Sequence, residues 1–511
     1  MSFSSGQRRV RNVGLLAGPL LALAVGVLLP GQYVGLDGSP VAFGASGRVT
    51  AAVAVWMATW WLSEAIPVYA TALVPVALFP LLGALSMKAA AAPYAHPLIF
   101  LFLGGFLIAI TMERWGLHRR IALVALRVVG ERPTHMVGAF MGVTALLSMW
   151  ISNSAAAIMM LPVATSVIDL VASRVGSGAA PTDRDGERVR PFALALLLGV
   201  AYAASIGGIG TPIGTPPNLF LLSYAEEHLG HPISFLRWMG VGVTLVVVFL
   251  PATWWLLTHV LFPPGIERVE GGAAAVGAAL EALGPMSRGE RTTLAVFGAT
   301  SLLWVTRPLL QSLEIAGSHP LAGLQDAGIA MFGALALFVI PVDGRRSVFA
   351  LDWRTAAGVP WGVLVLFGGG LSLAAAMQAN GVGLLLGSQV GALASWPPWV
   401  LVLATTTAVV FLTELTSNTA TAATLVPVLA GLAPGLGLDP ILLVVPAVLA
   451  ASCAFMLPAA TPPNAAIFGS GLVTIREMSR AGFWLNWIAI VLVTLLTYAV
   501  AIPLLGTGDV G

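Results

Sequence analysis

Long apolar runs dominate the chain, and only a few polar residues interrupt them. Runs long enough for a helix of roughly 20 residues across a ~30 Å bilayer core recur along the sequence. They lie near residues 13–32, 49–67, 68–86, 97–112, 191–225, 239–262, 291–308, 321–341, 358–378, 441–472 and 481–503. The pattern predicts an all-α polytopic membrane protein with about 11 transmembrane helices.

Two further apolar segments, 136–173 and 397–438, carry a polar triplet in their middle. The triplets are Ser152-Asn153-Ser154 and Ser417-Asn418-Thr419, and such side chains are costly to place in an apolar surrounding. Each segment is either a pair of full helices with a surface loop or a re-entrant hairpin. The arms of about 16 to 18 residues are borderline for spanning, and neither tip contains Lys, Arg or Asp. We therefore favour two re-entrant hairpins.

The two halves of the chain repeat the same motifs at the same spacing. Asn153 follows the pair Gly104-Gly105 by 48 residues, counted from Gly105, and Asn418 follows Gly370 of the pair Gly369-Gly370 by 48. The motif Thr-Pro-Pro-Asn at 215–218 recurs at 461–464. We predict four parts: an N-terminal tail and first helix over 1–48, a first repeat over 49–265, a cytoplasmic linker over 266–290, and a second repeat over 291–511.

An odd number of spans in each repeat turns the second repeat upside down relative to the first. Inverted repeats with interrupted helices are typical of secondary transporters, whose binding site lies near the midplane between the repeats. The interruptions are expected near 207–218 and 458–464, where proline removes hydrogen-bond donors and glycine loosens the backbone. Irregular backbone at membrane depth persists only when it is buried in protein or lines a cavity.

Two hairpin tips and two breaks together predict a polar chamber. Backbone carbonyls at a break suit Na⁺, and the N-terminus of the helix that resumes suits an anion. The four motifs contain no Arg or Lys, so a bound Na⁺ would supply the positive charge that an anion requires. Such mutual dependence is the thermodynamic basis of symport. The alternative is that these small polar groups only hold helices together.

Composition and charge support a membrane protein with a defined orientation. The chain is 58% hydrophobic and 9% charged, with a mean hydropathy of +0.93, which excludes an ordinary soluble domain. A cytoplasmic N-terminus and an external C-terminus satisfy the positive-inside rule. Only four basic residues then fall outside, namely Arg48, Lys88, Arg237 and Arg307. We interpret the basic loops as topology signals and not as nucleic-acid sites.

Three smaller features concern the cleavage of the N-terminus, the single cysteine and the cellular location of the protein. The pair Arg8-Arg9 precedes an apolar run without a convincing cleavage site, so we expect an uncleaved first helix. The single Cys453 excludes an internal disulfide and a thiolate metal cluster. Lys88 is the only lysine beside many arginines, a bias that fits a GC-rich bacterium and an inner-membrane location.

The motifs resemble those of the divalent anion/sodium symporter family, which includes bacterial and mammalian Na⁺/dicarboxylate carriers and carriers of citrate and sulfate. The resemblance covers nearly the whole chain. It rests on the segments 148–153, 411–419 and 456–464, and on Glu64-Ala65-Ile66-Pro67 and Phe102-Leu103-Gly104-Gly105. It implies a homodimer in which a transport domain slides against a scaffold, an elevator mechanism.

The resemblance also implies roles for single residues. One Na⁺ would be held by Ser148, Ser152, Asn153 and the backbone at Gly214, and the other by Thr413, Thr416, Asn418 and the backbone at Ala460. The substrate would meet Ser152, Asn153, Ser154, Thr215, Pro216, Ser417, Asn418, Thr419, Thr461 and Pro462. Two positions depart from the family pattern: Ser154 stands where Thr is usual, and Ala459 where Val is usual.

These observations predict a secondary transporter, not an enzyme, that couples Na⁺ to a C4-dicarboxylate such as succinate, fumarate or malate and needs no organic cofactor. Sulfate symport and dicarboxylate exchange are the alternatives within transporters. An intramembrane hydrolase is the alternative outside them, because residues 44–47 read Gly-Ala-Ser-Gly. His228 and His231 beside Glu226 and Glu227 suggest a metal site or a solvated loop. Glu64 and Glu414 fit either a capping role or a proton or cation role.

Overall fold

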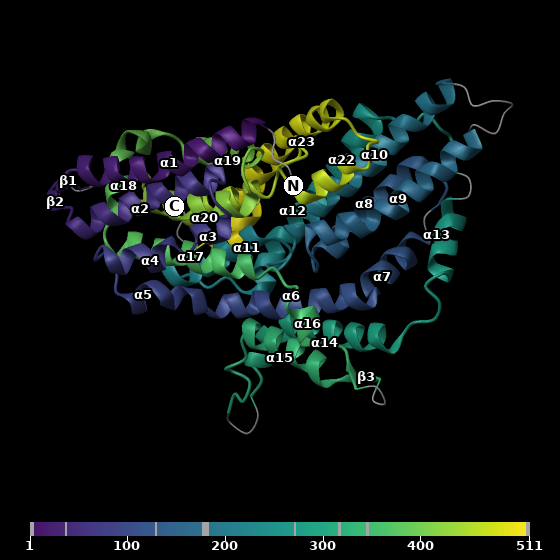
Figure 1. Ribbon diagram of the computed structural model, residues 1–511, viewed down its shortest axis with the longest axis horizontal. Helices are drawn as coiled ribbons and strands as arrows, with labels where there is room; N and C mark the ends of the chain where they lie inside the picture. The colour runs from purple at the N-terminus through teal and green to yellow at the C-terminus, as the bar shows by residue number, and fades with distance from the viewer. Residues whose placement is uncertain are drawn as a thin grey trace.

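The protein is a bundle of long helices with two very short hairpins of strands. The computed structural model describes residues 5–35, 38–127, 130–175, 183–269, 272–314, 318–343 and 347–506. Figure 1 shows helices from both halves of the chain lying side by side along the long axis of the molecule. The predicted all-α membrane fold is confirmed, and the predicted linker over 266–290 lies partly outside the described residues.

The N-terminal helices pack through small residues. Helix α1 (Ser5–Leu28) runs against α2 (Ala45–Ser63), and the hairpin of β1 (Gln32–Val34) and β2 (Pro40–Ala42) joins them. The run expected to span over 68–86 is divided, because Pro75 has no N–H to continue the helical ladder. The divided parts are α3 (Val68–Thr71) and α4 (Val74–Leu81), and after this run come α5 (Met87–Ala91) and a 3-10 turn over Ala92–Ala95.

The next helices build the first hairpin and the first break. They are α6 (Pro97–Trp115), α7 (Leu117–Leu126), α8 (Pro133–Ser148), α9 (Asn153–Val175), α10 (Asp183–Gly208), α11 (Pro216–His228) and α12 (Phe235–Trp255), which continues as a π-helical turn over Leu256–Leu261. Residues 149–152 form the turn between α8 and α9, and residues 209–215 form the break between α10 and α11. The break at 209–215 lies inside the interruption expected near 207–218.

A separate layer follows the linker. Its elements are α14 (Arg288–Gln311), α15 (Asp326–Val339), β3 (Pro341–Asp343), β4 (Val348–Phe349) and α16 (Trp353–Ala356). Helix α13 (Gly272–Glu281) lies within the linker and packs on α7 and α9. Helix α15 lies against α6, and Figure 1 shows α14, α15 and α16 below it. The guanidinium of Arg120 on α7 binds Glu290 of α14 at 2.6 Å. This ion pair ties the layer to the first half.

The remaining helices build the second hairpin and the second break. They are α17 (Trp361–Ala379), α18 (Val382–Gln389), α19 (Pro398–Thr413), α20 (Asn418–Leu432), α21 (Ile441–Ala451), α22 (Pro462–Gly469), α23 (Ile475–Leu496) and α24 (Ile502–Leu505). Two 3-10 turns, Gly391–Ser395 and Ala433–Leu436, lie between them, and a π-helical turn over Thr497–Ala501 follows α23. The same order of hairpin, broken helix and long helix thus occurs twice.

Matching backbone positions recur at a constant distance in the chain. Gly116 and Gly381 are both left-handed, with φ of 70° and 69°, and each begins a short helix. They are 265 residues apart, which is also the distance from Asn153 to Asn418. Glycine is required there because a side chain makes positive φ costly. The duplication expected from the tips therefore extends into the backbone around them.

Nine helices of the described part are long and apolar enough to cross a bilayer. Four shorter apolar helices accompany them: Val68–Leu81, Asp326–Val339, Pro398–Thr413 and Ile441–Ala451. Helices α8 and α19 have 16 residues each, which is about 24 Å of helix against a ~30 Å hydrocarbon core. These two arms are shorter than a full span, whereas α9 has 23 residues and is itself among the nine long helices, so the re-entrant hairpin stays a prediction.

Candidate functional site

The two hairpin tips make equivalent hydrogen bonds. The Ser148 hydroxyl at the end of α8 donates to the carbonyl of Ala204 at 2.6 Å, and its oxygen lies 2.7 Å from the Asn153 amide. The Thr413 hydroxyl at the end of α19 lies within donating distance of two acceptors, the carbonyl of Ala451 at 2.9 Å and Asn418 Oδ1 at 2.8 Å. Each tip is thus fastened to the last turns of the helix that precedes a break.

The Asn153 amide is surrounded by oxygen atoms. Its nitrogen is satisfied when it faces the carbonyls of Ala204 at 3.2 Å and Gly214 at 3.3 Å and the Ser148 hydroxyl at 2.7 Å. Ser148 is fully buried and Asn153 is half-buried. The structure therefore gathers Ser148, Asn153 and the Gly214 backbone, three members of the first expected Na⁺ set, around one point.

Two buried asparagines hold the breaks in shape. Asn218 Nδ2 donates to the carbonyls of Gly208 at 3.1 Å, Ile209 at 3.2 Å and Thr211 at 2.8 Å. Asn464 Nδ2 donates to the carbonyls of Ala454 at 3.2 Å and Leu457 at 3.1 Å. Several break carbonyls expected to be open are therefore already bonded inside the protein. The side-chain oxygens of both asparagines are buried without a hydrogen-bond partner among the described residues.

The long helix that follows each break packs closely against the backbone of that break, and a glycine lies at the contact. A Cβ at Gly242 of α12 would lie 2.4 Å from the carbonyl oxygen of Ile209, and one at Gly482 of α23 would lie 2.4 Å from the Phe455 carbonyl. Only glycine allows this close approach. Trp238 Nε1 on α12 donates to the same Ile209 carbonyl at 3.1 Å. The sequence motifs did not predict a role for these three residues, because the backbone groups that they contact are remote in sequence.

The helices that resume after the breaks begin with threonine and two prolines. Thr215 and Thr461 are the N-caps of α11 and α22, with extended backbone. The Thr461 hydroxyl accepts from the Asn464 N–H at 3.3 Å, whereas Thr215 makes no side-chain capping bond. Proline lacks an N–H, so each helix end keeps its dipole but loses two of the amide donors that a free N-terminus offers.

Glu414 is the strongest polar anchor of the second break. Its carboxylate accepts from the N–H groups of Phe455 at 2.7 Å, Met456 at 3.0 Å and Leu457 at 3.3 Å. The Asn486 amide of α23 donates to it at 2.9 Å, and both side chains are buried. The capping role considered for Glu414 is therefore the one its contacts support. Met149 stands 265 residues before it and has no carboxylate.

The remaining residues expected at the site differ in their hydrogen bonds and in their exposure. Ser152 is exposed and caps α9 through the Ala155 N–H at 3.2 Å. Thr416 bonds the Leu412 carbonyl at 3.0 Å and the Thr421 hydroxyl at 2.6 Å, away from Asn418. Within the described chain no hydrogen bond joins Ala460 to Asn418. The first-turn or cap residues Ser154, Pro216, Ser417 and Thr419 are half-buried, and Pro462 is exposed.

The hairpins and the broken helices are interlocked between the two halves. Helix α22 packs on α9 and α10, and α11 packs on α20 and α21. Each helix that resumes after a break therefore lies against the hairpin of the opposite half. This exchange brings both tips and both breaks into one assembly, which a single half cannot form alone.

The structure gives little support to a metal site or to an intramembrane hydrolase. Among the described residues no group of three or more His, Cys, Asp or Glu side chains is placed to hold a metal ion. Both ring nitrogens of His228 are buried without a partner, and its ring stacks on Tyr224 with centroids 4.8 Å apart. Ser46, the serine of the Gly-Ala-Ser-Gly sequence, lies in the first turn of α2, where its carbonyl accepts from Thr50 at 2.8 Å.

The fold is that of known membrane transporters. The structure is similar to the YdaH transporter of Alcanivorax borkumensis, with a TM-score of 0.58 and 12% sequence identity over 98% of this chain and 99% of that one. It is also similar to MtrF of Neisseria gonorrhoeae, with a TM-score of 0.56 and 13% identity over 97% and 96% of the two chains. At these identities the similarity concerns the fold alone.

Sequence comparison gives the family. Residues 28–506 match the sodium:sulfate symporter transmembrane region. The chain is 40% identical over 506 residues to sodium-dependent dicarboxylate transporters named SdcS from Staphylococcus aureus strains RF122 and MSSA476, a match that covers 99% of this chain and 93% of theirs. The protein belongs to the sodium:sulfate symporter family, as the motifs indicated.

Proposed function

We propose that the protein is a Na⁺-coupled symporter of a small C4-dicarboxylate such as succinate, fumarate or malate. The observation that carries the proposal is the pair of equivalent tips, in which a hydroxyl and an asparagine amide meet a carbonyl of the opposing broken helix. Family membership supports Na⁺ coupling, and the SdcS relatives bear the name of dicarboxylate transporters.

Na⁺ is the natural cation for these tips. It prefers hard oxygen ligands, and the first tip offers the Ser148 hydroxyl, the Asn153 amide oxygen and the Gly214 carbonyl. Loading the site requires the Asn153 amide to turn its oxygen toward the ion. The second tip offers Thr413 and Asn418 in the equivalent arrangement. Ser152, Thr416 and the Ala460 backbone complete the two sets when the tips adjust around the ions.

The substrate then meets the outer side of the same tips. Ser152, Asn153 and Ser154 bind one carboxylate, and the second triplet binds the other: Ser417, Asn418 and Thr419. The caps of the resumed helices add the hydroxyls of Thr215 and Thr461 and the adjoining Pro216 and Pro462. Because the four motifs contain no Arg or Lys, the dianion gains its counter-charge from bound Na⁺, and each ligand raises the affinity for the other.

Alternating access is an elevator motion in this proposal. The moving part contains both hairpins, both breaks, α12 and α23, while α6, α14, α15 and α17 belong to the scaffold of a homodimer. Gly105 of α6 faces Ile213 of the first break, where a Cβ on the glycine would lie 3.2 Å from the isoleucine side chain, and Gly370 of α17 faces Phe220 of α11. Small residues at these crossings leave a smooth surface for sliding. The N-terminus is cytoplasmic and the C-terminus external in the inner membrane.

Uptake into proteoliposomes tests the proposal. Labelled succinate should accumulate when an inward Na⁺ gradient is present and should not accumulate when K⁺ replaces Na⁺. Counterflow that is independent of Na⁺ would identify an exchanger, and absence of uptake of any dianion would refute the proposal. Sulfate is the second candidate, because the family carries the name of a sodium:sulfate symporter. Competition by sulfate against succinate in the same assay decides between them.

A further inference from the structure

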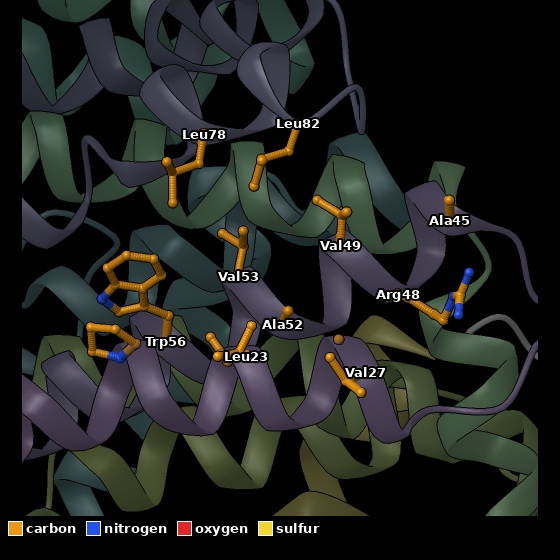
Figure 2. Close-up of a pocket in the computed structure, with 13 residues that line it drawn as sticks. Leu23, Val27, Ala45, Arg48, Val49, Ala52, Val53, Trp56, Leu78 and Leu82 are labelled. Carbon is orange, nitrogen blue, oxygen red and sulfur yellow. The ribbon is translucent and has the colours of Figure 1, made fainter.

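An open apolar crevice lies at one end of the molecule, among helices α1, α2 and α4 and apart from the hairpins. Its volume is 640 Å³, within the range of about 300–1,000 Å³ that is typical of small-molecule sites. Figure 2 shows that Leu23 and Val27 of α1, Val49 and Val53 of α2, and Leu82 of α4 form its walls. Arg48 stands at one end of this apolar space.

The packing of α1 on α2 explains why the crevice exists. At Gly14 and Gly18 the two helices touch so closely that a Cβ would lie within 2.7 Å of Ser63 or Trp60 atoms. Farther along, a Cβ at Gly26 would only reach ordinary contact, 3.6 Å from the Cβ of Ala52. Small side chains on both helices, including Ala22 and Ala45, therefore leave the space open.

The crevice borders a surface that faces hydrocarbon. On α1 the side chains of Leu20, Leu23 and Val27 are 64%, 66% and 70% exposed, and Leu82 of α4 is 49% exposed. In a membrane protein such apolar side chains contact lipid tails and not water. An apolar crevice that opens onto this surface is therefore accessible to an acyl chain.

The half-buried Arg48 gives the crevice a polar end that suits an anion. Its Nε is buried without a hydrogen-bond partner, and within the described residues no carboxylate pairs with it. A buried guanidinium nitrogen without an acceptor is costly. Arg48 also lies in the first turn of α2, where Gly44 provides no side-chain cap and no acidic residue is present. The positive end of the helix dipole adds to the attraction for negative charge.

We propose that this crevice binds one phospholipid, with an acyl chain between α1, α2 and α4 and the phosphate on Arg48. The occupant must be apolar along most of its length and anionic at one end, and a phospholipid meets both conditions. Arg48 lies about 12 Å from Trp56, eight residues along α2, and Trp56 forms the far wall of the crevice. A tail can therefore extend from Arg48 past Ala52 toward that tryptophan.

Native mass spectrometry of the detergent-purified full chain tests the proposal, with added phosphatidylglycerol as the probe and a diacylglycerol of the same chains as the comparison. One phosphatidylglycerol should remain bound, and the diacylglycerol should not. Arg48→Gln should lower the bound fraction at least fivefold, and Ala52→Phe, which fills the crevice, should lower it equally. Arg237→Gln, at an exposed arginine on α12, is the matched control and should retain the lipid.

Two outcomes would overturn the proposal. Unchanged lipid binding in both Arg48→Gln and Ala52→Phe would place the lipid elsewhere. A shift from dimer to monomer in these variants, without loss of lipid, would identify the crevice as an interface between two copies of the chain. Neither readout depends on transport, so the result is independent of the proposed function, and a melting curve for each variant confirms that it is folded.

Discussion

Phe102 of α6 stacks on Phe367 of α17, with ring centroids 4.5 Å apart and an interplanar angle of 23°. These residues are 265 positions apart, the same distance that separates Asn153 from Asn418. Equivalent residues of two repeats can touch each other only close to the axis that relates the repeats. The stacked pair therefore marks the centre about which the two tips and two breaks are arranged.

Removal of either tip asparagine should strongly weaken Na⁺-coupled transport. Asn153→Ala removes an amide that faces Ser148, Ala204 and Gly214, and Asn418→Ala removes the acceptor of Thr413. Loss of one ligand to Na⁺ that is worth about 1.4 kcal/mol or more lowers affinity at least about tenfold. Na⁺-dependent succinate uptake in proteoliposomes measures the effect.

Asn380→Ala serves as the control for these two variants. Its amide donates to Thr50 and to the Ala84 carbonyl, remote from the tips. This variant should keep its Na⁺ dependence. Uptake at the wild-type level in Asn153→Ala or in Asn418→Ala would refute the assignment of the tips.

Ser154 should influence which dicarboxylate is accepted. It is the position where the first triplet has one methyl group fewer than the second, which ends in Thr419. Ser154→Thr adds this methyl and narrows the site, so five-carbon dicarboxylates should lose about fourfold relative to succinate, the equivalent of one buried CH₂. The ratio of kcat/KM values for the two substrates is the measurement. Thr419→Ser should shift the ratio in the opposite direction, and equal ratios in all three proteins would exclude a role of Ser154 in selectivity.

Glu414 should determine the stability of the second break. Glu414→Ala leaves the N–H groups of Phe455, Met456 and Leu457 without their acceptor, and each buried unsatisfied group costs about 1–3 kcal/mol. The melting temperature in detergent should therefore fall well below that of the wild type. Met149→Ala, at the equivalent position of the first half, should have a smaller effect. A melting temperature of Glu414→Ala equal to that of Met149→Ala would contradict the capping role.

A covalent link between α17 and α11 should stop the elevator motion. A Cβ at Gly370 would lie 2.4 Å from the Phe220 ring, so Gly370→Cys combined with Phe220→Cys places two thiols in proximity. Cys453→Ala removes the only native cysteine. Oxidation should abolish uptake, and reduction should restore it. Full uptake by the oxidised protein, with the crosslink verified by mass spectrometry, would exclude relative movement of these helices.

His228 should make the protein less stable in mild acid. Burial, followed by the nearby His96, lowers the pKa of His228 from 6.5 to about 4. The unfolded chain therefore takes up this proton first, and stability falls as the pH drops from 6.5 towards 4. The loss at pH 5 is about 2 kcal/mol. His228→Phe keeps the stacking on Tyr224 and should flatten the pH dependence of the melting temperature, whereas an unchanged slope would assign the effect to another group.

Much of the fold was predictable because apolar run length and proline or glycine breaks are local properties. The runs indicated the helices, the triplets indicated the tips, and Thr-Pro-Pro-Asn indicated where α11 and α22 begin. The division of the run at 68–86 was missed, since a proline-containing apolar stretch is compatible with one helix or two. The bonds of Thr416 to Leu412 and Thr421 were also not predictable, because rotamers depend on neighbouring helices.

The sequence by itself determined the class of protein, since a chain so apolar can only fold in a bilayer and the repeated motifs are specific to one family of transporters. Only the tertiary structure decided which buried polar groups form hydrogen bonds with each other. Asn218 and Asn464 donate hydrogen bonds to carbonyls of the breaks, and Glu414 accepts from N–H groups of the second break. Helices α11 and α22 each pack against helices of the opposite half. The physical reason is that hydrogen-bond partners at the site are as much as 72 residues apart, and helix packing brings them together.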